Sequence, residues 1–180
     1  MDAIRDYLLD NNIISILARQ SDARYAAVRA KVEAISGKIW LPVVAIAEIR
    51  FGLAKSSLPN HPERAELEAF LAQYPLRARF DEHTIEPYAE IRAQLWRDYG
   101  TPKAKQRGHK EKLTEELVDR ATGICLGIDE RDLMIASSAA QFGLVLATND
   151  SGGSMRRIEE AAQRLEQDGK PVRLRVDYWP

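Results

Sequence analysis

The chain has 180 residues, of which 45% are hydrophobic and 29% charged, and its formal net charge is −1. This length suffices for one sizeable hydrophobic core, and we expect a single domain spanning residues 1–180. A net charge near zero excludes a protein that binds nucleic acid by bulk electrostatics alone. Any nucleic-acid substrate must therefore be held by local patches of the surface.

No apolar run approaches the roughly 20 residues needed to cross a bilayer, and the first residues do not have the pattern of a secretory signal. The single cysteine, Cys125, excludes an intramolecular disulfide and is compatible with a reducing cytosol. We therefore expect a cytoplasmic protein with no membrane partner. Cys125 lies in an apolar run, residues 124–126, and is interpreted as a packing residue.

Short apolar runs predict buried strands in chain order at residues 7–9, 39–41, 77–80, 144–147 and 172–176, of which 77–80 is the weakest candidate. Between these runs, apolar residues recur with helical spacing over residues 46–53, 67–71 and 133–140. Gly143 is placed to end the last of these helices. Strands that alternate with helices predict an open α/β fold, with a mainly parallel sheet flanked by helices.

The stretch at about residues 99–127 is polar and reads as an insertion within the domain. Leucine and alanine recur every four residues from Leu113 to Ala121, which predicts a short helix. A basic run within the stretch is ordinarily a solvated loop. Its functional interpretation is a clamp for a nucleic-acid backbone, with Arg107 and His109 as candidate phosphate contacts. The candidate side chains for this contact are Lys103, Lys105, Arg107 and Lys110.

Four acidic residues lie where the predicted elements meet. Asp10 directly follows the strand at 7–9, and Asp150 comes just after the strand at 144–147. Glu48 lies in or near the first turn of the helix that follows the strand at 39–41, and Asp132 lies at the start of the helix from Leu133 to Phe142. Because the carboxyl ends of parallel strands and the helices that continue from them share one edge of a sheet, these four acids can converge on one pocket.

Carboxylates packed together repel one another unless a cation neutralises them. Hard divalent ions such as Mg²⁺ or Mn²⁺ prefer oxygen ligands, and they activate water and stabilise charge on a phosphodiester. Each acid also has a structural explanation, either in the first turn of a helix or as a turn residue. From spacing alone, only an acidic site follows.

The local sequences around the acids resemble the four motifs of the PIN-domain family. Residues 8–15, LLDNNIIS, are similar to the opening Leu-Leu-Asp-Thr-Asn with its two aliphatic residues. AEIRFG at 47–52 resembles the second motif, DLMIA at 132–136 the third, and ATND at 147–150 the fourth. Their order matches the VapC-type toxins of bacterial toxin–antitoxin pairs, and the resemblance runs from about Tyr7 to the final strand, leaving the insertion unmatched.

This resemblance implies a PIN-domain endoribonuclease that hydrolyses RNA with Mg²⁺ or Mn²⁺ and a metal-activated water, acts as a toxin, is inhibited by a cognate antitoxin and forms a homodimer. Asn12 would lie beside the acids, and Thr148 would support the fourth one. The implied catalytic and metal-binding residues are Asp10, Glu48, Asp132 and Asp150.

The sequence departs from the family pattern beside two of the acids. Asn11 replaces a hydroxyl residue, and Ala45 stands where a threonine often caps the helix that carries Glu48, which favours a ligand role for Glu48 over a capping role. Asp129 is a rival to Asp132, because it could be the N-cap of the helix with Asp132 at its third position. Asp132 is preferred as the ligand because it alone has the family's spacing to the Ile-Ala pair at 135–136.

Two other classes of function compete with the nuclease. A non-catalytic PIN domain could bind RNA or protein, as the altered surroundings of Asp10 suggest. A metal-dependent phosphatase on another α/β fold is the third hypothesis.

Overall fold

The computed structural model describes residues 4–55, 62–100, 114–119 and 121–180. Its centre is a five-stranded sheet in which every pairing is parallel, with the order β3-β2-β1-β4-β5. The strands are β1 (Tyr7–Leu9), β2 (Ile39–Pro42), β3 (Leu76–Ala78), β4 (Val145–Thr148) and β5 (Arg175–Tyr178). The predicted α/β fold with a parallel sheet is confirmed.

The order of the strands places a topological switch point between β1 and β4. From β1 the chain builds outward to β2 and β3, and it then returns to the other side of β1 to add β4 and β5. Leu9 pairs with Ala147, so β1 and β4 end side by side. In open parallel sheets, ligands bind beyond the carboxyl ends of the strands at this point. Asp10 and Asp150 follow the two strands that flank it.

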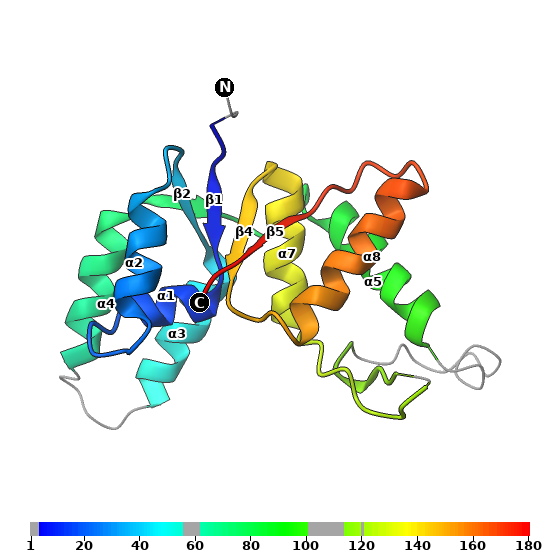
Figure 1. Cartoon of the computed structure of the whole chain (residues 1–180), viewed down its shortest axis with the longest axis horizontal. Coiled ribbons are helices and arrows are strands. Elements are labelled where there is room, and N and C mark those ends of the chain that lie inside the picture. The colour runs from blue at the N-terminus through cyan, green and yellow to red at the C-terminus, as the bar shows by residue number, and fades with distance from the viewer. Residues whose placement is uncertain (1–3, 56–61, 101–113, 120) are drawn as a thin grey trace.

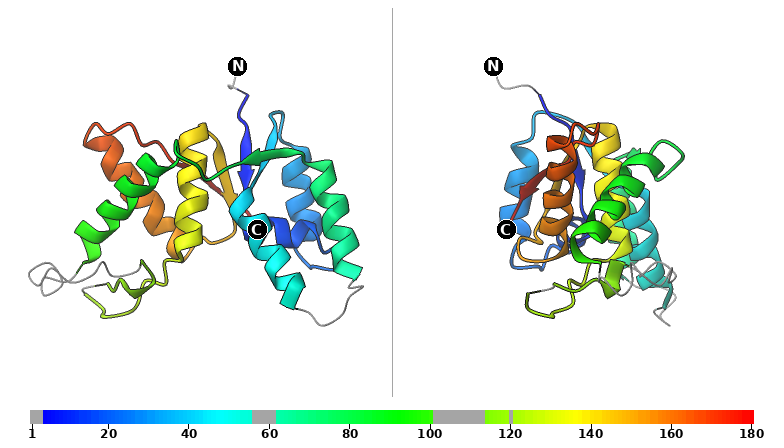
Figure 2. Two further views of the ribbon diagram at one scale, coloured as in Figure 1. Left: turned by 180° about the vertical axis from the view of Figure 1, so that it is seen from behind. Right: turned by 90° about the vertical axis from the view of Figure 1, so that its right-hand side faces the viewer.

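Helices lie in two groups on either side of the strands (Figure 1). The first group is α1 (Asn11–Leu17), α2 (Tyr25–Glu33), α3 (Val43–Lys55) and α4 (Pro62–Gln73). The second is α5 (Ile85–Tyr99), α7 (Glu130–Phe142) and α8 (Ser154–Gln167). Helices α5, α7 and α8 pack on one another, and the views of Figure 2 show them together on one side. Covering both faces of the sheet explains why its strands are short apolar runs rather than alternating ones.

The core is built from the strands and from one stripe of each helix. Leu8, Leu41 and Leu146 are fully buried in three neighbouring strands. In α7 and α8, which pack on each other, Leu133 and Ile158 are fully buried. Within the described residues, no helix is long and apolar enough to cross a membrane.

The strands predicted at 7–9, 39–41, 77–80 and 144–147 occur within two residues at their ends, and α3, α4 and α7 contain the three predicted helical segments but extend beyond them by two to five residues. The strand predicted at 172–176 is wrong in its first half, because pairing with β4 begins at Arg175. Val172 and Leu174 are buried. The alternation of apolar and polar residues here therefore reflects side chains that pack into the core, although the backbone is not paired with a strand. Helices α1, α2, α5 and α8 were not predicted, although α8 buries Ile158 and Leu165 on one face.

The predicted insertion differs from expectation in its described part. The short helix expected from Leu113 to Ala121 is wrong over the described residues: a 3₁₀ turn (η1, Thr114–Glu116) is followed by an antiparallel bridge between Val118 and Cys125. The Asp119 carboxylate accepts hydrogen bonds from two backbone N–H groups ahead of it, which turns the chain instead of continuing a helix. Cys125 is exposed, with Sγ 2.8 Å from the carbonyl oxygen of Glu115, so its interpretation as a packing residue is wrong.

The candidate RNA-binding residues of the basic run lie outside the described residues, and so do His109 and Leu113. These residues are Lys103, Lys105, Arg107 and Lys110. Their proposed role is therefore still a prediction.

Gly143 ends α7 as predicted, in the left-handed region with φ 64° and ψ 30°. We expect Gly143→Ala to lower the free energy of unfolding by about 1 kcal/mol, because a Cβ there would meet no atom and only the backbone conformation is penalised. Gly52→Ala is the matched control: Gly52 is exposed within α3 with equally open space, and alanine there should stabilise by about 0.5–1 kcal/mol. Urea unfolding of both variants measures the two shifts, and equal signs would contradict the assignment of Gly143 as the helix end.

Candidate metal centre

Asp10 is the most deeply buried of the four acids, with 2% of its surface exposed. It is the N-cap of α1, and one carboxylate oxygen accepts a hydrogen bond from the Asn11 N–H at 2.7 Å. The other oxygen accepts the Thr148 hydroxyl, also at 2.7 Å. Burial raises the pKa of Asp10, against the lowering effect of these two donors. Thr148 thus holds Asp10 directly, in addition to the support for Asp150 expected from the family.

Asp150 lies in the loop between β4 and α8. Its N–H donates to the Thr148 hydroxyl at 3.2 Å, and its carboxylate accepts from the N–H of Met155 at 3.1 Å. Backbone N–H groups in the first turn of a helix favour a negative charge at this place. A Cβ on Gly153 would come within 2.5 Å of the carboxylate, so only glycine leaves Asp150 in this position.

Asp132 faces Asp150 across the hydroxyl of Ser154. This hydroxyl lies 2.7 Å from the Asp132 carboxylate and 3.1 Å from that of Asp150. The pKa of Asp132 is raised to about 6, chiefly by burial and also by the charges of Asp10, Asp129 and Asp150, against the lowering effect of the Ser154 hydrogen bond. Thr148 and Ser154 therefore link Asp10, Asp150 and Asp132 into one chain of hydrogen-bonded groups.

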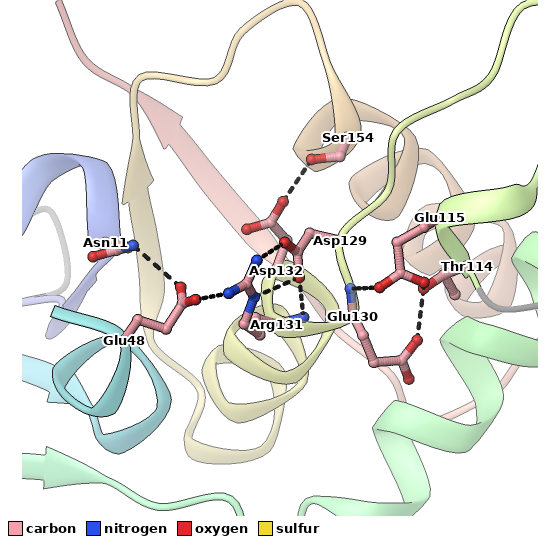
Figure 3. Close-up of polar contacts among 9 residues, drawn as sticks. All are labelled: Asn11, Glu48, Thr114, Glu115, Asp129, Glu130, Arg131, Asp132 and Ser154. Atoms are coloured by element: carbon pink, nitrogen blue, oxygen red, sulfur yellow. Dashed lines mark hydrogen bonds and ion pairs between the residues drawn. The ribbon is translucent and has the colours of Figure 1, made fainter. Parts of the chain in front are cut away.

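Glu48 is turned toward a different partner. Helix α3 begins at Val43, so Glu48 lies in its second turn, Ala45 is inside the helix and not at its cap, and the capping argument does not apply. One Glu48 oxygen accepts from the guanidinium of Arg131, and the other accepts from the Asn11 amide at 3.2 Å (Figure 3). Burial raises the pKa of Glu48, while the Arg131 charge opposes this.

Asp129 and Asp132, the two rivals for a place among the acids of the site, have different roles in the structure. Asp129 is the N-cap of α7 and accepts from the N–H of Arg131 at 2.8 Å. Asp132, in the first turn of α7, instead accepts a hydrogen bond from the Ser154 hydroxyl, and the charge of Asp10 raises its pKa. The geometry therefore favours Asp132 as the member of the acidic group.

Three residues beside the acids were not assigned a role there from the sequence: Asn11, Arg131 and Ser154. Asn12, which the family resemblance put beside the acids, is exposed, whereas its neighbour Asn11 contacts Glu48. The signal for Ser154 was its position four residues after Asp150, in the first turn of a helix.

The donors present suit a hard divalent cation. The four carboxylates are linked electrostatically, since Asp10 acts on the pKa of both Glu48 and Asp132. The side-chain oxygen of Asn11 is a buried acceptor with no hydrogen-bond partner. In the part of the chain that the structure describes, however, no three acidic, histidine or cysteine side chains are grouped closely enough to hold an ion as they stand.

Comparison with known proteins gives a family match over most of the chain. The sequence model of the family described as "PIN domain" matches residues 7–161. No curated protein sequence matches. The family match argues against a phosphatase on another α/β fold.

Solved structures with a similar fold include several VapBC and Fit complexes. VapBC2 from Rickettsia felis bound to a DNA fragment from their promoter is 19% identical, covers 97% of this chain and 99% of the matched chain, and has a TM-score of 0.55. DNA-bound VapBC from Salmonella typhimurium is 17% identical over 98% and 99%, with a TM-score of 0.56. FitAcB from Neisseria gonorrhoeae is 28% identical over 84% and 92%, with a TM-score of 0.52.

The hydrogen bond between Thr148 and Asp10 predicts a stability difference between two conservative variants. Thr148 is fully buried, and Thr148→Val keeps its volume but leaves an Asp10 oxygen without a donor, so we expect a loss of about 1–3 kcal/mol. Thr148→Ser keeps the hydroxyl and loses one methyl group, at a cost of about 1 kcal/mol. Urea unfolding in EDTA compares them; a valine variant as stable as the serine variant would contradict the importance of this bond.

The raised pKa of Asp132 predicts a specific dependence of stability on pH. Because the folded state keeps its proton up to about pH 6, while an unfolded aspartate loses it near 3.8, stability is lost as the pH rises through this window. In EDTA, the unfolding free energy of the wild type should fall by about 2 kcal/mol more than that of Asp132→Asn between pH 4.5 and 7.5. Parallel pH profiles for the two proteins would contradict the burial of this carboxyl group.

Proposed function

The chain belongs to the PIN-domain family, and on this basis we propose that it is a metal-dependent endoribonuclease that hydrolyses RNA phosphodiester bonds. One observation carries the proposal: Asp10, buried at the switch point of the sheet, is joined through Thr148 and Ser154 to Asp150 and Asp132. Three acids at the edge where parallel sheets bind ligands are more than helix capping requires.

Mg²⁺ or Mn²⁺ is the proposed cofactor, held by Asp10, Asp132, Asp150 and Glu48. The donors are oxygens, as hard cations prefer, and the unpartnered Asn11 oxygen adds a neutral one beside them. When bound, such an ion lowers the pKa of a coordinated water and stabilises the charge that develops on the phosphodiester.

The negative charge of the site determines the order in which the metal ion and RNA bind. A phosphodiester is an anion, so the buried carboxylates repel it until a cation is present. The Thr148 and Ser154 hydroxyls donate to the carboxylates of Asp10 and Asp132 and restrict the orientation of these side chains. We therefore expect RNA to enter this site only in the metal-loaded protein.

We further propose that the protein is the toxin of a toxin–antitoxin pair, acts as a homodimer and is inhibited by an antitoxin. The support is the order of its four motifs, which is that of VapC-type toxins, and the similarity of its fold to VapBC and FitAcB structures. The lysine- and arginine-rich run at 103–110 is proposed to contact the RNA backbone.

RNA cleavage tests the proposal directly. Purified protein with Mg²⁺ should cut RNA; EDTA should abolish cleavage, and Asp10→Asn should reduce it by about 100-fold or more, because one ligand charge is removed. Asp22→Asn is the matched control, since Asp22 pairs with Arg24 on the surface and contacts none of the four acids. Cleavage that persists unchanged in both EDTA and Asp10→Asn would contradict metal-dependent hydrolysis.

Expression in bacteria extends the same comparison to toxicity. The wild type and Asp22→Asn should arrest growth, Asp10→Asn should not, and co-expression of a small protein encoded next to the gene should relieve the arrest. Growth unaffected by the wild type would contradict the toxin assignment and leave the nuclease assignment to the cleavage assay.

A non-catalytic binding module is the second candidate, favoured by the orientation of Glu48 toward Arg131. It predicts RNA or protein binding without cleavage, and no tight Mn²⁺ binding by calorimetry. Tight Mn²⁺ binding that Asp150→Ala abolishes would count against it.

A further inference from the structure

Arg131 places a positive charge between Glu48, one of the four acids of the site, and Asp129, the N-cap of α7. Its side chain is 52% exposed, and its guanidinium contacts Glu48 on one side and Asp129 on the other (Figure 3). Asp129 also accepts from Nε of Arg131 and from its backbone N–H, both at 2.8 Å. Arg131 is thus anchored to Asp129 at the start of α7, and only part of its guanidinium reaches Glu48.

Glu48 is correspondingly separated from the other acids. One of its oxygens is taken by Arg131 and the other by the Asn11 amide. Asp10, Asp150 and Asp132 are linked through two hydroxyls without it. The contact with Arg131 therefore accounts for the orientation of the acid that does not join the group.

We infer that Arg131 is a positioning residue that competes with the divalent ion for Glu48. This inference rests on the proposed function, because the ion is the metal of that site. Glu48 cannot serve the guanidinium and an ion beside Asp10 with the same oxygens, and two cations that share its surroundings repel each other. Because Asp129 stays bound to Arg131, the guanidinium keeps an ion-pair partner when Glu48 turns away from it toward the ion.

A purely structural ion pair would have a different signature. A half-exposed pair contributes little to the stability of a fold, so its loss would leave metal binding unchanged, or weaken it if the pair held Glu48 in place for the ion. Competition gives the opposite sign: removal of the guanidinium strengthens metal binding. The direction of the change therefore separates the two roles.

Calorimetric titration of the metal-free full-length protein with Mn²⁺, in the absence of RNA, tests this. Arg131→Gln should bind Mn²⁺ roughly three- to tenfold more tightly than the wild type, because one nearby positive charge is removed in a partly solvated site. Arg131→Lys keeps the charge and should stay near the wild type. Arg29→Gln is the matched control, because Arg29 is paired with Glu33 in α2 and should leave the affinity unchanged. Thermal unfolding in EDTA verifies that each variant is folded.

A double-mutant cycle tests the route through Glu48. Glu48→Gln should weaken Mn²⁺ binding, and in that background Arg131→Gln should change the affinity by less than about twofold. An undiminished gain in the Glu48→Gln background would overturn the competition for this carboxylate. Unchanged or weaker binding by Arg131→Gln alone, or no Mn²⁺ binding by either protein, would overturn the inference as well.

The binding readout also separates this inference from the proposed function. If Arg131→Gln binds Mn²⁺ more tightly but no variant cleaves RNA, the inference stands and the nuclease assignment fails. If the wild type cleaves RNA and Arg131→Gln does not gain affinity, the nuclease assignment stands and the inference fails.

Discussion

Repulsion between carboxylates is the constraint on which the arrangement at this edge of the sheet depends. The strand order brings Asp10 and Asp150 to neighbouring strand ends, and α7 adds Asp132. The repulsion is reduced by hydroxyl donors, by backbone N–H groups and by the charge of Arg131. Each of these compensations is local, whereas the proposed divalent cation would neutralise several of the carboxylates together.

Two of these carboxylates, those of Asp10 and Asp150, also accept hydrogen bonds from backbone N–H groups at the N-termini of helices. Asp10 caps α1 with one oxygen and binds Thr148 with the other, and Asp150 accepts from the first turn of α8. Hydrogen bonding to a helix N-terminus and metal binding are therefore compatible roles for these residues, because the N–H groups of the helix hold the carboxylate in position. Asp129 differs from the acids of the site. It caps α7, but its carboxylate forms an ion pair with Arg131.

Sequence patterns predicted the parts of the molecule that depend on backbone topology. Strand ends located Asp10 and Asp150, and Gly143 marked the end of α7. They could not predict the direction of side chains: Asn11 and Asn12 differ by one position on α1, yet one contacts Glu48 and the other faces solvent. The same limit applies to Glu48, whose partner lies 83 residues further along the chain. Val172 and Leu174 show that buried residues outside the sheet can produce the same sequence pattern as a strand.

The hydrogen bond between Asp10 and Thr148 joins residues 138 positions apart. During synthesis at roughly 5–20 residues per second, the first acid is therefore made several seconds before the strand that completes its surroundings. Until β4 has left the ribosome, β1 lacks one of its two neighbours in the sheet, and neither Asp150 nor Ser154 is available. An unfinished chain thus carries only a fragment of the acidic site, which is complete only after Ser154 has been made.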